Sequence, residues 1–336
     1  MARPPLVSIL LPAFNAAATL PACLRSVQRQ AEPGWQCVIV DDGSGDGTLA
    51  CARHFAARDE RFEVIPAPHL GLVSALNTGL AHCRGRYVAR MDADDVMHRE
   101  RLAVQVRALE ATPELAAVGC HVRLFPRDGL RAGRRAYERW LNNIDSAHRV
   151  REEAFVECPI VHPTLVIRRE LLVEFGYRDA GWPEDYDLLL RLLAAGYEIS
   201  VVPRRLLCWR DRPARLSRTS PVYGLDRFAP CKAAFLAAQF LAGHDTYILW
   251  GYGDTGRALR RALLAHGKRP SHIVEVHAGR LGNRIHGAAV ISPQALAALH
   301  GHRLIASVAG AQPRRQIRQA LQAMGFCELH DFVCAA

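Results

Sequence analysis

Apolar and polar positions along the first hundred residues predict strands and helices in alternation. The apolar runs Val7–Leu11 and Gln36–Val40 are typical of strands that are buried on both faces. Between them, Thr19–Gln30 has apolar residues at helical spacing. Further elements are expected at Asp46–Arg58 (helix), Phe62–Ile65 (strand), Gly71–Cys83 (helix) and Tyr87–Met91 (strand). This order predicts a doubly wound, mostly parallel α/β sheet, with a ligand crevice beyond the carboxyl ends of its strands.

The pattern continues less regularly and then starts afresh near residue 244. Strands are expected at His162–Ile167 and Ile199–Val202, and a helix at Glu184–Ala195, whereas Arg123–Arg139 lacks periodicity and is expected to be irregular. Thr246–Trp250 predicts another strand, followed by a glycine-rich turn and a helix to His266. We therefore predict a first domain at 1–218, a linker and helix at 219–243, and a small second α/β domain at 244–336.

Composition and charge narrow the class of protein. The 336 residues suffice for about two domains. The chain has 43 basic and 33 acidic residues and a net charge of +10, which favours anionic partners such as nucleoside diphosphates, acidic lipid headgroups or nucleic acid, or serves only solubility. The ten cysteines form no Cys-x-x-Cys pair, and no apolar run approaches the roughly 18 residues that span a bilayer. We expect a cytoplasmic protein, with the inner face of the plasma membrane as an alternative location.

Acidic residues follow a predicted strand at Asp92-Ala93-Asp94-Asp95. Residues i and i+2 of a strand face the same side, so Asp92 and Asp94 are expected to point together. Two such carboxylates would suit Mg²⁺ or Mn²⁺, which prefer oxygen ligands and keep positions open for phosphate oxygens. The alternative interpretation is an acidic turn that caps the next helix.

Two further acidic pairs are candidates for binding and catalysis. Asp41 and Asp42 end a buried strand before a glycine turn, where a carboxylate can accept hydrogen bonds from a ribose hydroxyl or a base N–H. Glu184 and Asp185 begin a predicted helix, where a carboxylate can act as a general base. An ordinary turn and an ordinary helix start are the simpler alternatives.

Taken together and in order, six motifs resemble those of a family 2 glycosyltransferase of the GT-A fold, over residues 6 to about 218. They are Val7–Asn15, Val40–Thr48, Gly71–Gly79, Gly85–Asp95, His162-Pro163-Thr164 and Glu184–Leu188. Each motif is weak alone, and the ordered set is specific. His69 departs from the family pattern, because asparagine is frequent at that position.

The resemblance implies a UDP- or dTDP-sugar donor bound with Mg²⁺ or Mn²⁺. The residues that it places at the nucleotide sugar are Pro12, Ala13, Asn15, Asp41, Asp42, Asp92 and Ala93. It makes Asp92 and Asp94 the metal ligands and Asp185 the catalytic base, with Glu184 beside it. It also implies a single displacement that inverts the anomeric configuration.

A second nucleotide site is predicted near the C-terminus. Gly251, Gly253 and Gly256 follow a predicted strand and open a helix, in the spacing of a dinucleotide-binding turn. Glu275, 24 residues after Gly251, is the candidate for the ribose-binding acid. The segment resembles the small Rossmann-like domains attached to some sugar-modifying enzymes. A degenerate domain that serves packing or dimerisation is the alternative.

The sequence therefore favours an inverting, metal-dependent glycosyltransferase that makes a bacterial surface polysaccharide or glycolipid. The expected partners are a nucleotide-sugar donor and a saccharide or lipid-linked saccharide acceptor, without nucleic acid; membrane contact and a homodimer are left open. The arginine clusters at 131–139 and 204–218 could bind the phosphates of donor or acceptor, or form a solvated face. A nucleotide-sugar or NAD sensor without turnover is the main alternative. A nucleotidyltransferase is disfavoured, because Pro12–Ala18 lacks a Gly-rich, Lys-containing loop.

Overall fold

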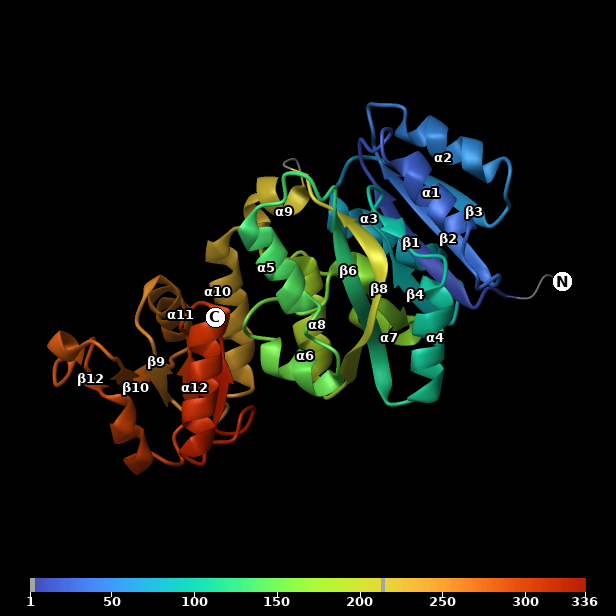
Figure 1. The fold of residues 1–336 in the computed structure, drawn as a ribbon. Coiled ribbons are helices and arrows are strands. Elements are labelled where there is room, and N and C mark those ends of the chain that lie inside the picture. The colour runs from blue at the N-terminus through green and yellow to red at the C-terminus, as the bar shows by residue number, and fades with distance from the viewer. Residues whose placement is uncertain (1–3, 213–214) are drawn as a thin grey trace. The chain divides into compact units, whose positions relative to one another are not determined.

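The structure, a computed structural model, describes residues 4–212 and 215–336 and divides into two compact units (Figure 1). The first unit comprises residues 1–150, 159–180 and 191–215, and the second comprises residues 151–158, 181–190 and 216–336. Residues 1–3 of the predicted first domain and 213–214 of the second arginine cluster lie outside the described residues. Within the described part of the chain, no helix is both long and apolar enough to cross a membrane.

The first unit is built on an eight-stranded sheet with the order β3-β2-β1-β4-β7-β6-β8-β5. The strands are β1 (Val7–Ala13), β2 (Trp35–Asp42), β3 (Phe62–Ala67), β4 (Tyr87–Arg90), β5 (Val96–Met97), β6 (Leu115–Phe125), β7 (Val166–Arg168) and β8 (Glu198–Arg210). Strands β3, β2, β1 and β4 are parallel neighbours, so their carboxyl ends share one edge. Strand β7 runs antiparallel to β4 and β6, and β5 runs antiparallel to β8.

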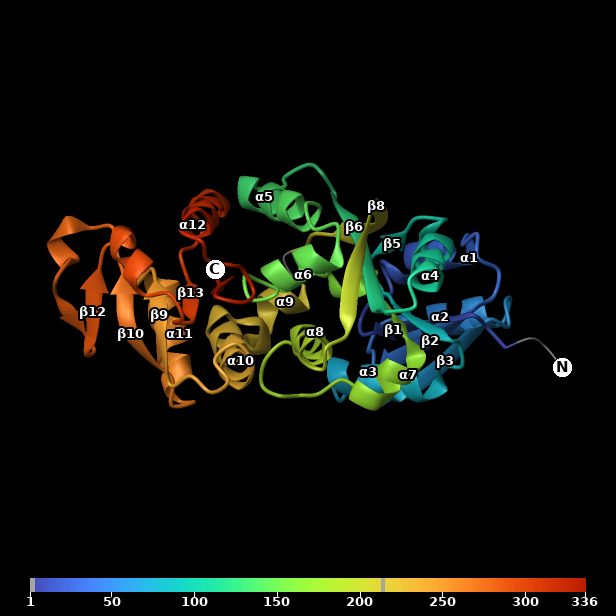
Figure 2. The same ribbon diagram turned by 90° about the horizontal axis from the view of Figure 1, so that it is seen from below.

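Helices cover both faces of this sheet, as a doubly wound arrangement requires (Figure 2). The helices up to residue 175 are α1 (Leu20–Gln28), α2 (Thr48–Ala56), α3 (Leu72–His82), α4 (Arg101–Ala111), α5 (Ala132–Leu141), α6 (Ala147–Glu153), the 3-10 helix η1 (His162–Thr164) and α7 (Arg169–Phe175). On one face, Leu20 and Leu24 of α1 pack into the same core as Ile9 of β1. On the other face α3 lies very close, since a Cβ on Gly79 would meet Leu10 Cδ1 at 2.4 Å.

The segment 123–139, expected to be irregular, is ordered. Strand β6 runs to Phe125 and helix α5 begins at Ala132. The arginines of α5 obscured its apolar positions in the sequence, yet Arg134 stacks its guanidinium over the rings of Tyr137 and Trp209. An arginine that packs its planar group on aromatic rings covers apolar surface, so it does not behave as a purely polar position.

The second unit contains a six-stranded sheet with the order β11-β12-β10-β9-β13-β14. Its strands are β9 (Thr246–Trp250), β10 (Arg269–Val274), β11 (Arg284–Ile285), β12 (Ala288–Ile291), β13 (Leu304–Ala306) and β14 (Phe332–Cys334), and all neighbouring pairs except β11 and β12 are parallel. The remaining helices of the chain are α8 (Glu184–Ala194), α9 (Leu216–Thr219), η2 (Pro221–Tyr223), α10 (Leu225–Ala238), α11 (Asp254–Leu264), η3 (Ala278–Arg280), η4 (Pro293–Ala298) and α12 (Ala311–Ala323).

Strand β9 is buried on both sides of this second sheet. Leu249 packs in one core with residues of α10 and α11, while Ile248 packs in another core with residues of α12. The predicted strand at 246–250 and the helix after it are confirmed. The next strand, β10, ends at Val274, so Glu275 follows the strand directly.

Candidate active site

The candidate residues of the first unit gather where its parallel strands end. Ala13 at the end of β1 pairs with Asp41 of β2, and Leu10 pairs with Arg90 at the end of β4. The loops that carry the predicted polar residues therefore leave the sheet from neighbouring positions. This is the edge at which open parallel sheets bind ligands.

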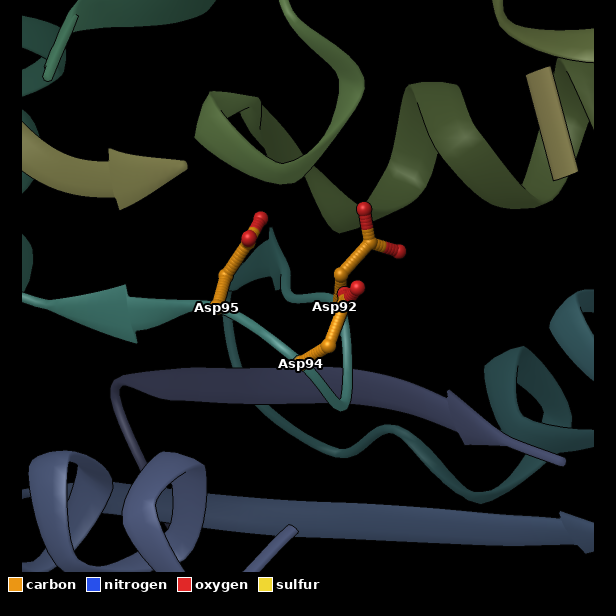
Figure 3. A group of neighbouring side chains, drawn as sticks. All are labelled: Asp92, Asp94 and Asp95. Atoms are coloured by element: carbon orange, nitrogen blue, oxygen red, sulfur yellow. The ribbon is translucent and has the colours of Figure 1, made fainter. Parts of the chain in front are cut away.

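Asp92, Asp94 and Asp95 form the one group of three or more potential metal ligands among the described residues, with their ligand oxygens within 4.8 Å of one another. Figure 3 shows the three side chains rising from one loop toward the same side. Strand β4 ends at Arg90, and the backbone N–H of Asp95 donates to the carbonyl of Asp92 at 3.2 Å. A turn therefore brings the carboxylates together, and the i, i+2 alternation of a strand was the wrong reason for expecting it.

Arginines surround this acidic cluster. The guanidinium of Arg90 pairs with the carboxylate of Asp92, and Arg212 Nε lies 3.0 Å from Asp94 Oδ2. Arg210 contacts the loop twice, from its backbone N–H to Asp95 Oδ1 and from Nε to the carbonyl of Asp94, both at 2.7 Å. Arg90 and Asp95 were not assigned to the site from the sequence, whereas the second arginine cluster was a candidate for binding phosphate. The signal for Asp95 was its place beside Asp94, and Arg210 and Arg212 lay inside the second arginine cluster.

The three carboxyl groups differ in pKa because their surroundings differ. Burial raises the pKa of Asp92, but the guanidinium groups of Arg90 and Arg215 outweigh that and hold it below its ordinary value. Burial and the neighbouring charge of Asp92 raise the pKa of Asp94. Burial raises the pKa of Asp95 well above its usual range, and the charges of Asp92 and Asp94 add to this. Among the described residues Asp95 Oδ2 has no hydrogen-bond partner although it is buried, as expected of a ligand atom for a cation.

At the ends of β1 and β2, polar side chains tie the loops to one another. Asn15 Oδ1 accepts from the backbone N–H of Gly45, and the backbone N–H of Asn15 donates to Ser44 Oγ, both at 2.9 Å. Asp41 Oδ2 accepts from the backbone N–H of Ser44 at 3.3 Å, and its buried Oδ1 has no hydrogen-bond partner within residues 4–212 and 215–336. Pro12 and Ala13 are the buried last residues of β1. The sheet thus brings Pro12, Ala13, Asn15, Asp41 and Asp42 to one corner.

Asp42 is held by the loop that follows β3. Its Oδ1 accepts from the backbone N–H of Leu70 at 2.9 Å, and its Oδ2 accepts from that of Gly71 at 3.1 Å. His69 Nδ1 lies 2.9 Å from the same Oδ2, and the His69 ring stacks on Phe14 with centroids 4.0 Å apart.

Glu184 and Asp185 open helix α8, and both lie in the second unit. Glu184 is buried, and its Oε2 accepts a hydrogen bond from the Tyr223 hydroxyl at 2.5 Å. Asp185 is partly exposed, and its Oδ1 accepts from the backbone N–H of Tyr186 at 2.8 Å. The ring of the next residue, Tyr186, is fully buried, and its hydroxyl donates a hydrogen bond to the carbonyl of Ala154. The geometry thus leaves the Asp185 side chain more accessible than that of Glu184.

The three glycines of the second unit occupy different environments. A Cβ on Gly256 would lie 2.2 Å from the carbonyl oxygen of Gly251, which itself has φ +96°, while a Cβ on Gly253 would meet nothing within 4 Å. Gly256 is therefore required for close packing of α11 on the turn, whereas Gly253 faces open space. Glu275 is engaged locally, because Arg280 Nη1 donates to its Oε2 at 2.9 Å. Hydrogen bonds from Val276 and Arg280 outweigh the effect of burial and lower the pKa of Glu275.

Comparison with known proteins gives the same fold for the first unit. The family profile described as Glycosyl transferase family 2 matches residues 8–176. The amylovoran biosynthesis glycosyltransferase AmsE of Erwinia amylovora is 30% identical over 204 residues, which cover 60% of this chain and 74% of AmsE.

Two solved structures share the fold at low identity. The complex of S. aureus TarS with UDP-GlcNAc has a TM-score of 0.57 at 17% identity, covering 77% of this chain and 72% of that one. The mannosyltransferase PcManGT of Pyrobaculum calidifontis, solved with GDP-Man and Mn²⁺, has a TM-score of 0.50 at 24% identity, covering 79% and 70%. The chain is a glycosyltransferase of the GT-A fold and belongs to glycosyl transferase family 2.

Proposed function

We propose that the enzyme moves a sugar from a UDP- or dTDP-sugar to a hydroxyl group of a saccharide, in the synthesis of a bacterial surface polysaccharide or glycolipid. The observation that carries the proposal is the group of three carboxylates at the carboxyl edge of the parallel strands. The relative AmsE is named for amylovoran biosynthesis, and TarS was solved with UDP-GlcNAc, which supports the classes of product and donor.

The acidic loop fits a divalent cation of the Mg²⁺ or Mn²⁺ type. Its donors are hard carboxylate oxygens, and one of them, Asp95 Oδ2, is buried and has no hydrogen-bond partner in the part of the chain that the structure describes. Asp92 and Asp94 would hold the ion. A bound cation would supply Lewis-acid stabilisation of the charge that develops on the leaving diphosphate. Mn²⁺ in the PcManGT complex supports this choice of metal.

The rest of the carboxyl edge would bind the donor. The residues proposed to line the nucleotide-sugar site are Pro12, Ala13, Asn15, Asp41, Asp42, Asp92 and Ala93. Their loops are tied to one another by hydrogen bonds, so they can present a preformed surface. Arg210 and Arg212, which already contact the Asp94 region, would add positive charge beside the diphosphate.

Asp185 is proposed as the general base of a single displacement. The acceptor oxygen would form a bond to the anomeric carbon as the carbon–oxygen bond to the diphosphate breaks. The bonding electrons would leave on the diphosphate, the acceptor proton would pass to Asp185, and the anomeric configuration would invert. Asp185 suits this role better than Glu184, because Glu184 is buried and bonded to Tyr223.

The test is an assay of released nucleoside diphosphate, with UDP-, dTDP- and GDP-sugars, oligosaccharide acceptors and Mn²⁺. The Asp185→Asn substitution should reduce kcat by about 10²- to 10⁴-fold with nucleotide affinity retained, as for a lost general base. Retained turnover in Asp185→Asn would remove Asp185 from this role. Nucleotide-sugar binding without any release of diphosphate by the unaltered enzyme would favour the sensor.

We further propose that the second unit is Rossmann-like and binds a nucleotide at Gly251, Gly253 and Gly256, with Glu275 near the ribose. Support comes from the parallel order β12-β10-β9-β13-β14 and from the crowded Gly256 beside the open Gly253. The Gly253→Val substitution should remove the thermal shift caused by the nucleotide that binds there, with NAD, UDP and UDP-sugars as probes. Gly279→Ala, at another open glycine of this unit, is the matched control. An unchanged shift in Gly253→Val would contradict the site.

Other expectations from the sequence stay predictions. These are the boundaries at residues 218 and 243, a lipid-linked acceptor, contact with the inner face of the plasma membrane, and a homodimer. Sedimentation of the purified chain, alone and with anionic vesicles, tests the last two.

A further inference from the structure

Phe14 and His69 form an exposed aromatic pair at the carboxyl edge of the first unit. Phe14 follows β1 directly, and His69 lies two residues after the end of β3. Their rings are stacked at an interplanar angle of 12°, and the Phe14 side chain is 45% exposed. Planar exposed rings at this edge are suited to a flat ligand such as a nucleobase.

Asp42 is the side chain expected to contact the base, but most of the hydrogen-bonding capacity of its carboxylate is used within the protein. It is 4% exposed, and its two oxygens accept the backbone N–H groups of Leu70 and Gly71 as well as the contact from His69. The imidazole of His69, which contacts Asp42 Oδ2, is the more accessible member of this pair, because its side chain is 55% exposed.

The surroundings of His69 assign its tautomer. Nδ1 lies 3.0 Å from the backbone carbonyl of Asp42 and 2.9 Å from its Oδ2, and both oxygens can only accept a hydrogen bond. Nδ1 must therefore carry the hydrogen. In the neutral ring Nε2 then holds a lone pair and is an acceptor. Nε2 has no hydrogen-bond partner among the described residues, so this acceptor is available to a ligand.

The loop that presents His69 is held close to the end of β2. Gly43 has φ +69°, and a Cβ at that position would lie 2.7 Å from the backbone nitrogen of His69. Together with the hydrogen bonds of Asp42, this close approach leaves the loop little freedom to withdraw. Phe14 acts as a positioning residue, because its ring packs against one face of the imidazole.

We propose that His69 determines the choice of pyrimidine in the donor, with Nε2 accepting the N3–H of uracil or thymine. This inference rests on the proposed use of a nucleoside diphosphate sugar. Uracil and thymine both present an N–H at position 3, whereas cytosine presents a lone pair there. With cytosine, the N3 lone pair would face the lone pair of His69 Nε2, so no hydrogen bond would form between them.

The test measures binding of UDP, CDP and N3-methyl-UDP to the full chain with Mn²⁺ by titration calorimetry. The unaltered enzyme should bind UDP about tenfold more tightly than CDP or N3-methyl-UDP, as expected for one lost hydrogen bond. CDP changes the group at position 3 without added bulk, and N3-methyl-UDP changes it without altering the rest of the ring edge. If CDP and N3-methyl-UDP both bind about tenfold more weakly than UDP, the lost hydrogen bond explains the difference, because only N3-methyl-UDP adds bulk.

The same UDP and CDP affinities are then measured in variants of His69, which shows how much of the preference depends on this side chain. His69→Phe keeps an aromatic ring and removes the acceptor, so it should bring the affinities for UDP and CDP to within about twofold. His69→Ala removes the ring without adding bulk and should do the same if the bulkier variant folds poorly. His82→Phe is the matched control, since His82 Nδ1 also pairs with a carboxylate, Glu63, at 2.8 Å. It should keep the tenfold preference.

The outcomes separate this inference from the proposed function. A UDP preference that survives in both His69→Phe and His69→Ala overturns the role of His69 and leaves the proposed function standing. Equal binding of UDP and CDP by the unaltered enzyme overturns it as well. Failure of the unaltered enzyme to bind any nucleoside diphosphate overturns the proposed function, and this inference with it.

Discussion

The two units place polar groups at the carboxyl edge of a parallel sheet, but they do so with different atoms. In the first unit the loop after β4 presents carboxylate side chains, with Asp92, Asp94 and Asp95 within 4.8 Å of one another. In the second unit the loop after β9 presents backbone, with Gly253 at the start of α11 and no group of three metal-ligating side chains among its described residues.

The two proposed sites would use the same architecture for two kinds of recognition. Carboxylates attract cations and through them the phosphates of a donor, so one substitution can remove the function. Backbone N–H groups at a helix N-terminus attract phosphate directly, and only a change of backbone or packing can remove them. The predictions below test each side of this contrast.

Of the tests that compare the two units, the largest effect is expected from Asp94→Asn, which keeps the shape of the side chain and removes its charge. Loss of a charged group from the proposed metal site should reduce kcat/KM by about 10²- to 10³-fold. A titration with Mn²⁺, followed by electron paramagnetic resonance, should show weaker binding of the ion. Asp128→Asn, at an exposed position of the same unit, is the control. An unchanged Mn²⁺ titration would contradict the metal site.

In the second unit Gly256→Ala should act through packing. The new Cβ would lie 2.2 Å from the carbonyl oxygen of Gly251 and 2.7 Å from Ser307 Oγ. Overpacking of this kind costs about 1–3 kcal/mol of unfolding free energy. Scanning calorimetry should show the loss, and Gly279→Ala should leave the unfolding temperature nearly unchanged. Equal stability of the two variants would show that α11 can move away from the turn.

The second unit should also respond to alkaline pH through Lys232. Burial lowers the pKa of this amine from 10.5 to about 8, and Nζ donates to the carbonyls of Val156 and Ala335. Between about pH 8 and 10.5 the unfolded chain binds the extra proton, so this residue makes stability rise with pH by at most about 3 kcal/mol. Denaturant titrations should show that Lys232→Met removes this contribution. Identical pH profiles for the two proteins would contradict the lowered pKa.

The smallest effect concerns Arg212, which lies 3.0 Å from Asp94 Oδ2. A guanidinium there competes with a divalent cation for the same carboxylate, and this surface pair is weak. Arg212→Ala should therefore tighten Mn²⁺ binding, by about fivefold at most if the pair contributes about 1 kcal/mol. Arg204→Ala, which removes an ion pair with Glu100, is the control. Weaker Mn²⁺ binding in Arg212→Ala would show that the arginine does not compete.

The sheet and its edge could be predicted because they depend on local patterns. Apolar runs such as Val7–Leu11 predicted buried parallel strands, and the structure confirms the mostly parallel, doubly wound arrangement. Parallel strands share an edge at their carboxyl ends, so the sequence alone places Asp42 and Asp92 at the same edge of the sheet.

The partners of these residues could not be predicted, because they come from distant parts of the chain. The bond from Arg210 to Asp95 spans 115 residues, and that from Leu70 to Asp42 spans 28. No periodicity connects such positions. Helix α5 was missed for a related reason, since Arg134 acts as an apolar surface only where aromatic rings are available to it.

The arginines around Asp92 and Asp94 mean that this edge carries its own counter-ions before a donor arrives. Binding a cation and a diphosphate there would replace the arginine–aspartate ion pairs by aspartate–cation and arginine–phosphate pairs. Few unpaired charges would be neutralised in this exchange. Each guanidinium displaced from a carboxylate would stay tethered within reach of the incoming phosphates. Donor affinity should then change little with ionic strength, since the count of close opposite charges is nearly conserved.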